Sequence, residues 1–130
     1  MSMIPHAELI DYYHQSQFCF FPSTAQTGFS RTPLEAMACG SVVISYGYEG
    51  SNEIISNGQN GFLVEEGDVD SAMQVIQGLV ADPSRIIRVR ETARHFVEDN
   101  HTLSRYVDRI EQAIWDTINE KCSLSQDVIN

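Results

Sequence analysis

Basic residues are scarce in this sequence. Its 130 residues include 8 Lys and Arg against 18 Asp and Glu, which gives a formal net charge of −10 at pH 7. An acidic surface repels phosphate backbones and anionic lipids, so neither nucleic acid nor a membrane surface is expected as a partner. Any phosphate group that this chain binds has to be held by local backbone dipoles rather than by a broad basic patch.

Cysteines and long apolar runs are also few. The three cysteines, Cys19, Cys39 and Cys122, are odd in number and fit no zinc-binding spacing. This pattern favours buried free thiols in a reducing compartment. Pro5 and Glu8 interrupt the N-terminal segment, so no signal peptide is expected, and no apolar run approaches the ~20 residues of a membrane span. We therefore expect a cytoplasmic protein without a membrane span.

Short apolar segments alternate with segments of helical periodicity, which is typical of a parallel sheet covered by helices. Buried strands are predicted at Phe18–Phe21, Val42–Tyr46 and 61–64. The predicted fold class is α/β: a partial Rossmann-like three-layer domain with a short parallel sheet of about three strands and flanking helices. Asp68 is expected to cap one helix. The predicted helices cover residues 6–16, 33–39, 52–57, 69–81, 84–98 and 102 to about 120.

The segment from Pro22 to Gly40 joins the end of a predicted strand to the start of a predicted helix. In open parallel sheets, ligands bind beyond the carboxyl ends of the strands. The first turn of a helix presents free N–H groups and a partial positive charge. Gly28 lets the backbone come close to a ligand, and Pro33 suits the start of a helix. The segment therefore predicts a phosphate site.

Glu35 has two possible roles in this segment. The run Thr32-Pro-Leu-Glu35 matches a capping box, in which the glutamate side chain bonds back to the backbone N–H of the capping threonine. The alternative is that the carboxylate accepts hydrogen bonds from a ribose diol. The local spacing leaves both roles open. By contrast, His6 and His14 are expected on a solvated helix surface.

Several strings occur in a particular order and spacing between about His6 and Phe96. They are Phe20-Phe-Pro-Ser23, Gly28-Phe29, Pro33-Leu-Glu-Ala-Met-Ala-Cys-Gly40, Val42-Val-Ile-Ser45, Glu53-Ile54, Asn60-Gly-Phe-Leu-Val64 and Gly67-Asp68. In these strings the chain resembles the later part of the C-terminal domain of group 1 retaining glycosyltransferases with the GT-B fold. That domain binds the donor nucleotide in the family, so the resemblance implies a nucleotide-sugar as the substrate and no metal or other cofactor.

The resemblance also implies the residues of the donor site, with Glu35 binding the ribose. Gly28, Phe29 and Ser30 would face the transferred sugar. Two positions depart from the family pattern, because the family has an acid at position 27 and usually glycine at position 30. Both departures put catalysis in doubt. The implied nucleotide-sugar site consists of Thr27, Gly28, Phe29, Ser30, Arg31, Thr32 and Glu35.

Taken together, these features predict the donor-binding part of a retaining glycosyltransferase for hexosyl or related transfer, inactive alone. The family's three earlier strands, with their Gly-Arg and Lys, and its acceptor domain have no counterpart in this sequence. The expected domain covers residues 1–120, followed by a frayed tail at 121–130. A homodimer, or a chain that supplies the missing half, is the expected partner. The alternative is a non-catalytic assembly domain, or a vestigial one, that keeps the fold.

Overall fold

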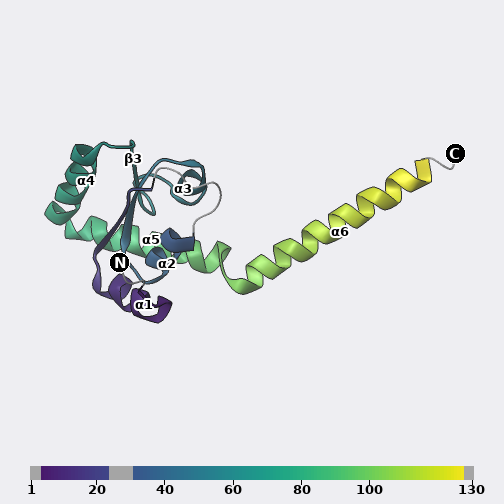
Figure 1. The fold of residues 1–130 in the computed structure, drawn as a ribbon, viewed down its shortest axis with the longest axis horizontal. Coiled ribbons are helices and arrows are strands. Elements are labelled where there is room, and N and C mark those ends of the chain that lie inside the picture. Colours follow the sequence, from purple (N-terminus) through teal and green to yellow (C-terminus); the bar gives the residue numbers. More distant parts are fainter. Residues whose placement is uncertain (1–3, 24–30, 128–130) are drawn as a thin grey trace. The chain divides into compact units, whose positions relative to one another are not determined.

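A parallel sheet of three strands lies at the centre of the N-terminal part of the chain (Figure 1). The computed structural model describes residues 4–23 and 31–127. In the described sheet the strand order is β1 (Phe18–Phe21), β2 (Val42–Tyr46), β3 (Phe62–Val64), and both pairs are parallel. The first two strands have the predicted bounds, and the third begins one residue later than predicted. The predicted α/β class is therefore confirmed. The strand β1 was predicted to be buried but is only half-buried, with Phe20 exposed, because it lies at the edge of the described sheet.

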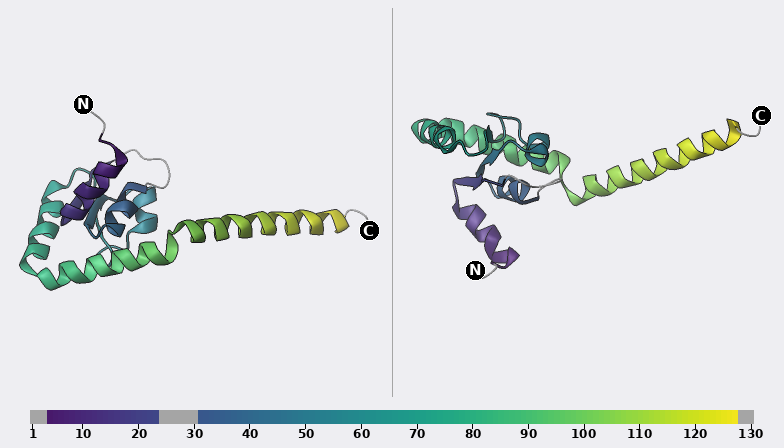
Figure 2. Two further views of the ribbon diagram at one scale, coloured as in Figure 1. Left: turned by 90° about the horizontal axis from the view of Figure 1, so that it is seen from below. Right: turned by 45° about the horizontal axis from the view of Figure 1, so that its top comes forward.

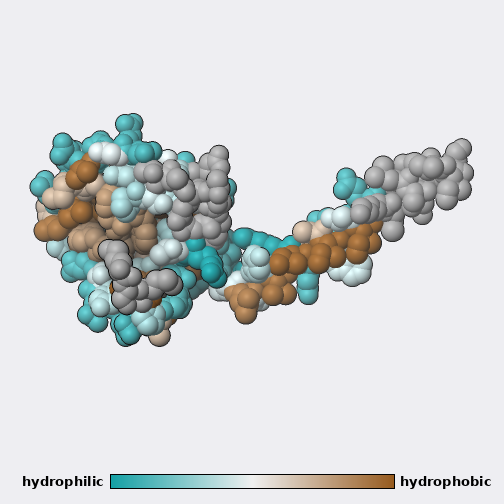
Figure 3. Space-filling view, in the orientation of Figure 1, coloured by the Kyte–Doolittle hydropathy of each residue, from teal (hydrophilic) through white to brown (hydrophobic). Residues whose placement is uncertain are grey.

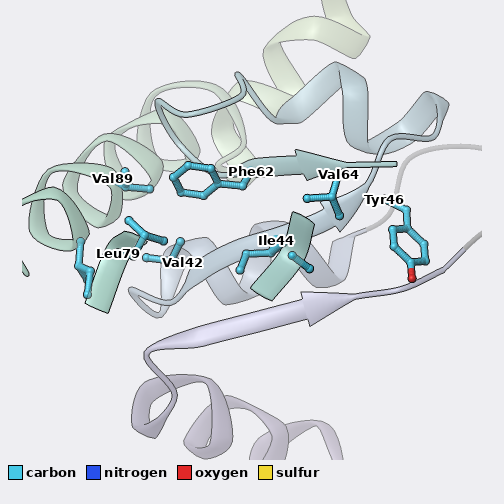
Figure 4. Close-up of a cluster of buried hydrophobic side chains, with 9 residues drawn as sticks. Val42, Ile44, Tyr46, Phe62, Val64, Leu79 and Val89 are labelled. Carbon is cyan, nitrogen blue, oxygen red and sulfur yellow. The ribbon is translucent and has the colours of Figure 1, made fainter. Parts of the chain in front are cut away.

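The middle strand β2 is buried along its whole length. Because side chains alternate between the two faces of a strand, Val42, Ile44 and Tyr46 point to one side of the sheet. Figure 4 shows Val42 and Ile44 toward Phe62, and Tyr46 at the other end of the cluster, on the side of Val64. Val43 points to the other side and belongs to a separate apolar cluster. A strand buried on both faces needs a continuous apolar run, which explains why it is recognisable in the sequence.

Helices cover both faces of the sheet, so the domain has three layers (Figure 2). On one face, α4 (Val69–Ala81) and the first half of α5 (Pro83–Asn100) contribute Leu79 and Val89 to the cluster around β2. On the other face, α1 (His6–Gln15), α2 (Arg31–Ala38) and α3 (Glu49–Ile54) pack around Val43. Ala93, farther along α5, belongs to this second cluster.

Local polar groups set the ends of these helices. Asp68 accepts a hydrogen bond from the Ser71 backbone N–H at 2.9 Å, so the predicted cap of α4 is confirmed. Gly40 follows α2 with a φ of 84°, a left-handed conformation that favours glycine. The helix α3 starts earlier than predicted, because the Ser51 hydroxyl accepts the Tyr48 N–H at 3.1 Å and closes the first turn there.

A second compact unit follows at residues 99–130. Its helix α6 (Leu103–Asp127) begins where the Thr102 hydroxyl accepts the Arg105 N–H at 3.3 Å. The helix continues past Glu120, where the prediction ended it, as far as Asp127. Within the described ranges, no helix is both long enough and apolar enough to pass through a membrane.

Candidate functional site

The candidate site lies where β1 leads into α2. Both β1 and β2 end at this edge of the sheet because the strands are parallel. Four of the predicted site residues, Thr27, Gly28, Phe29 and Ser30, lie outside the described residues. The other three, Arg31, Thr32 and Glu35, lie within the first five residues of α2.

The buried face of α2 fixes this helix against the sheet. Pro33, Leu34, Ala36 and Met37 are buried, and Ala36 and Met37 are fully shielded from solvent. Glu35 lies between two of these residues in sequence and keeps 31% of its side-chain surface exposed. The carboxylate is therefore held on a rigid element while part of it stays accessible to a ligand.

Glu35 contacts His6, a residue that the sequence did not place in the site. The Nε2 atom of His6 lies 3.3 Å from Oε1 of Glu35, and the His6 side chain is 66% exposed. His6 is exposed on the surface of α1, as expected, but its contact with Glu35 was not expected. A signal was present, because His6, Leu9 and Tyr13 recur at helical spacing and so lie on one face of α1.

The predicted capping box places Thr32 at the N-cap of its helix, and the structure does not support that placement. The helix α2 is already formed at Arg31, so Thr32 is an internal residue of its first turn. A capping box needs the glutamate three residues after the cap. The helix begins one residue before the predicted cap, and the Oε1 atom of Glu35 contacts Nε2 of His6.

Weakly acidic groups beside Glu35 are kept in their neutral forms. Burial, reinforced by the negative charge of Glu35, raises the pKa of Tyr13 to about 12. Burial and then Glu35 also raise the pKa of the Cys39 thiol. Burial likewise raises the pKa of Cys19, although a hydrogen bond with Ser41 acts in the opposite direction. Both thiols are free but half-buried rather than buried as predicted, and a raised pKa makes them poor nucleophiles.

Arg31 is an exposed cation in the first turn of α2. The ion pairs in the described part of the chain join His6 with Glu35, Arg88 with Asp82, and Arg94 with Glu98. Arg31 belongs to none of them, so its guanidinium can take an anion at the positive end of the helix. Over residues 4–23 and 31–127, no group of three or more His, Cys, Asp or Glu side chains is placed to hold a metal ion.

Known glycosyltransferases match this sequence. The family model described as glycosyl transferases group 1 matches residues 2–114. The chain is 36% identical over 89 residues to D-inositol 3-phosphate glycosyltransferase 1 of Catenulispora acidiphila, covering 68% of this chain and 21% of that protein. It is 33% identical over 94 residues to the capsular polysaccharide biosynthesis glycosyltransferase CapM of Staphylococcus aureus, covering 72% and 23%. The chain thus spans about a fifth of the length of these curated relatives.

Solved structures show the same fold. Sucrose-phosphate synthase from Thermosynechococcus elongatus aligns with a TM-score of 0.80 at 25% identity, over 92% of this chain and 30% of that one. The Anabaena protein HepE in complex with UDP-glucose aligns with a TM-score of 0.69 at 25% identity, over 84% of this chain and 29% of that one. The chain belongs to the group 1 family of glycosyl transferases and has the Rossmann-like fold of GT-B domains.

Proposed function

We propose that this chain binds the nucleotide-sugar donor of a retaining glycosyltransferase, in which hexosyl or related groups are transferred. The observation that carries the proposal is the partly exposed carboxylate of Glu35 near the start of α2, in a chain of this family. The complex of HepE with UDP-glucose supports a nucleotide-sugar as the ligand class.

The proposed contacts follow from the chemistry of each group. The Glu35 carboxylate accepts hydrogen bonds from the ribose hydroxyls, because an ionised carboxylate is a pure acceptor. The diphosphate lies at the N-terminal end of α2 beside Arg31 and Thr32, where backbone N–H groups and the helix dipole favour an anion. For residues 27–30, which lie outside the described residues, the resemblance to the family implies that they face the transferred sugar.

A ligand titration tests the donor site. Without a basic cluster, binding of UDP or GDP is expected in the millimolar range, about 4 kcal/mol. Backbone NMR signals at the start of α2 should shift on titration, and Glu35→Gln should abolish the saturable shift. Glu91→Gln, which removes an exposed carboxylate from α5, is the matched control and should bind like the wild type. No shift at about 10 mM nucleotide would overturn the donor site.

We further propose that the chain does not transfer sugar by itself. It spans about a fifth of its curated relatives, and GT-B chemistry takes place between two domains. Thr27 also stands where the family has an acid. The purified chain should therefore show no transfer from UDP-glucose to an acceptor and no more than trace hydrolysis. Turnover that disappears in Glu35→Gln would contradict this proposal.

A second candidate function is assembly, and α6 favours it. Val107, Ile110, Ile114 and Ile118 recur at helical spacing, and each is 44–52% exposed. Figure 3 shows apolar side chains along this helix. Such a stripe is the usual apolar seam of a paired helix. The edge strand β1, which pairs only with β2 in the described sheet, offers further backbone groups for pairing.

The proposed occupant of this stripe is a second copy of the chain. An antiparallel pair of α6 helices would bring Arg105 and Arg109 of one copy toward Asp116 and Glu120 of the other, although Asp108 and Glu111 share the half of α6 that carries the two arginines. Light scattering after size exclusion should give a dimer mass, and Ile110→Asp should give a monomer, with Gln112→Asp as the control for added charge. A monomeric wild-type chain at high concentration would exclude this assembly.

A further inference from the structure

The contact between His6 and Glu35 joins two helices that are distant in sequence. The other two ion pairs in the described ranges, Arg88 with Asp82 and Arg94 with Glu98, link residues six or fewer positions apart. His6 and Glu35 are 29 residues apart, so their contact depends on how α1 packs against α2. The Glu35 carboxylate in this contact is also the group that we propose binds the ribose hydroxyls of the donor.

The position of His6 is set by the buried part of α1. Tyr13 is 6% exposed and packs in the apolar cluster with Leu34 and Met37 of α2. The Ser41 hydroxyl, which follows α2, bonds to the Tyr13 carbonyl at 2.8 Å and to the Ser16 carbonyl at 2.9 Å. These contacts fix the C-terminal half of α1. His6 lies about two helical turns before Tyr13 on the same face of α1, beside Glu35.

We propose that His6 is a positioning residue, which orients the Glu35 carboxylate toward the ribose hydroxyls of the donor. This inference rests on the proposed donor site. A carboxylate only accepts hydrogen bonds, so His6 donates its Nε2 proton to Oε1. The two carboxylate oxygens offer about four lone-pair positions. The imidazole occupies one of them and leaves enough for both hydroxyls of a diol.

Orientation matters because a glutamate side chain is long and flexible. A ligand that binds a freely rotating carboxylate has to immobilise it, which costs affinity. His6 restricts that rotation before the ligand arrives. The expected benefit for a ligand that uses Glu35 is roughly two- to tenfold in affinity, the range for one immobilised side chain. A ligand that does not use Glu35 gains nothing.

The test compares ligands with and without the diol. UDP and GDP are titrated by calorimetry against the wild type, and the tighter nucleotide is compared with its 2′,3′-dideoxy form. His6→Ala should weaken the diol-bearing nucleotide roughly two- to tenfold and leave the dideoxy form unchanged. His6→Gln, whose amide can donate a hydrogen bond from a similar position, should recover part of the lost affinity for the diol-bearing nucleotide. His14→Ala, an exposed histidine of the same helix, should change neither affinity.

The outcomes separate this inference from the donor site itself. If the wild type does not distinguish the two ligands, Glu35 does not bind the diol and the proposed function fails. If the wild type distinguishes them and His6→Ala does so equally well, the donor site stands and the positioning role is overturned. An equal loss for both ligands, or tighter binding of the diol form by His6→Ala, also overturns it. Melting curves check that each variant is folded.

Discussion

Asn60 connects the end of α3 to the start of β3, and its replacement tests how that connection is held. The side chain is 2% exposed. Its Oδ1 accepts the Ser56 N–H at 2.8 Å, and its Nδ2 donates to the Ile54 carbonyl at 2.9 Å. Asn60→Ala removes both bonds. Ile54 is buried, so its carbonyl loses a partner that water does not readily replace.

The expected cost is about 2–4 kcal/mol of unfolding free energy. A buried backbone group left without a partner costs roughly 1–3 kcal/mol. The buried Ile54 carbonyl should contribute the larger share, and the N–H of the exposed Ser56 the smaller one. Domains of this kind are stable by only about 5–15 kcal/mol. The change would therefore remove a large fraction of the stability.

Urea denaturation followed by circular dichroism measures this cost. Gln59→Ala, which removes an exposed amide next in sequence, is the control and should stay within about 0.5 kcal/mol of the wild type. Asn60→Asp keeps the acceptor for Ser56 but loses the donor to Ile54 at neutral pH, and should remain destabilised. A loss below about 1 kcal/mol for Asn60→Ala would refute the reasoning, because both backbone groups would then have found other partners.

Four further predictions concern packing and titration. Gly61→Ala should cost about 1–3 kcal/mol in urea denaturation, because its Cβ would lie 3.0 Å from the Val43 carbonyl oxygen. Gly58 has open space but a φ of 78°, so Gly58→Ala should cost about 1–2 kcal/mol and Gly58→Asn less; equal values for the two Gly58 variants would contradict this explanation. Leu79→Ala should lower the melting temperature by an amount equivalent to about 2–5 kcal/mol, since Leu79 is fully buried. Tyr13 has its pKa raised to about 12 in the folded state, so the folded state keeps the phenolic proton that the unfolded chain loses near pH 10. The contribution of Tyr13 to the free energy of unfolding is fully present below about pH 10 and is lost as the pH rises toward 12. About 1.4 kcal/mol of it is lost at pH 11. Tyr13→Phe should lack this part of the decline between about pH 9 and 11, and an unchanged decline would refute it.

The middle strand β2 was predictable because burial on both faces requires a continuous apolar run. The run Val42–Tyr46 is bounded by the non-apolar residues Ser41 and Gly47, so the sequence contains both its position and its ends. Helix ends were harder. The start of α3 depends on the Ser51 hydroxyl, which also bonds to the Tyr46 carbonyl at 2.7 Å. That bond needs the end of β2 to be in place, and local periodicity does not contain this information.

The extent of α6 was underestimated for a different reason. Beyond Glu120 the sequence loses the regular apolar spacing on which the prediction relied. The helix nevertheless continues to Asp127. Once a helix has formed, each further residue adds a backbone hydrogen bond at little cost. A helix can therefore extend beyond the end of its apolar stripe. The apolar periodicity of a sequence therefore shows which part of a helix has an apolar face, and it does not fix the residue at which the helix ends.

The candidate site shows the same division between local and tertiary information. The local spacing singled out Glu35 with two possible roles, and the family resemblance implied the ribose role; the structure places Glu35 on α2 with a partly exposed carboxylate. Its partner His6 was missed, since a contact across 29 residues exists only after two helices have packed. A histidine on the same helix face as a buried tyrosine lies close to the neighbouring helix, where an acidic residue can be its partner.

The arrangement of α2 explains how a carboxylate can be both fixed and available. A helix buried on one side places residues adjacent in sequence about 100° apart around its axis. Ala36 and Met37 are fully buried, so the backbone next to Glu35 has little freedom to move. The rotation of Glu35 about its own side-chain bonds remains, and His6 is the contact that restricts it. Substitutions at Met37 should therefore displace the carboxylate through the backbone, whereas substitutions at His6 should release its rotation and leave the backbone in place.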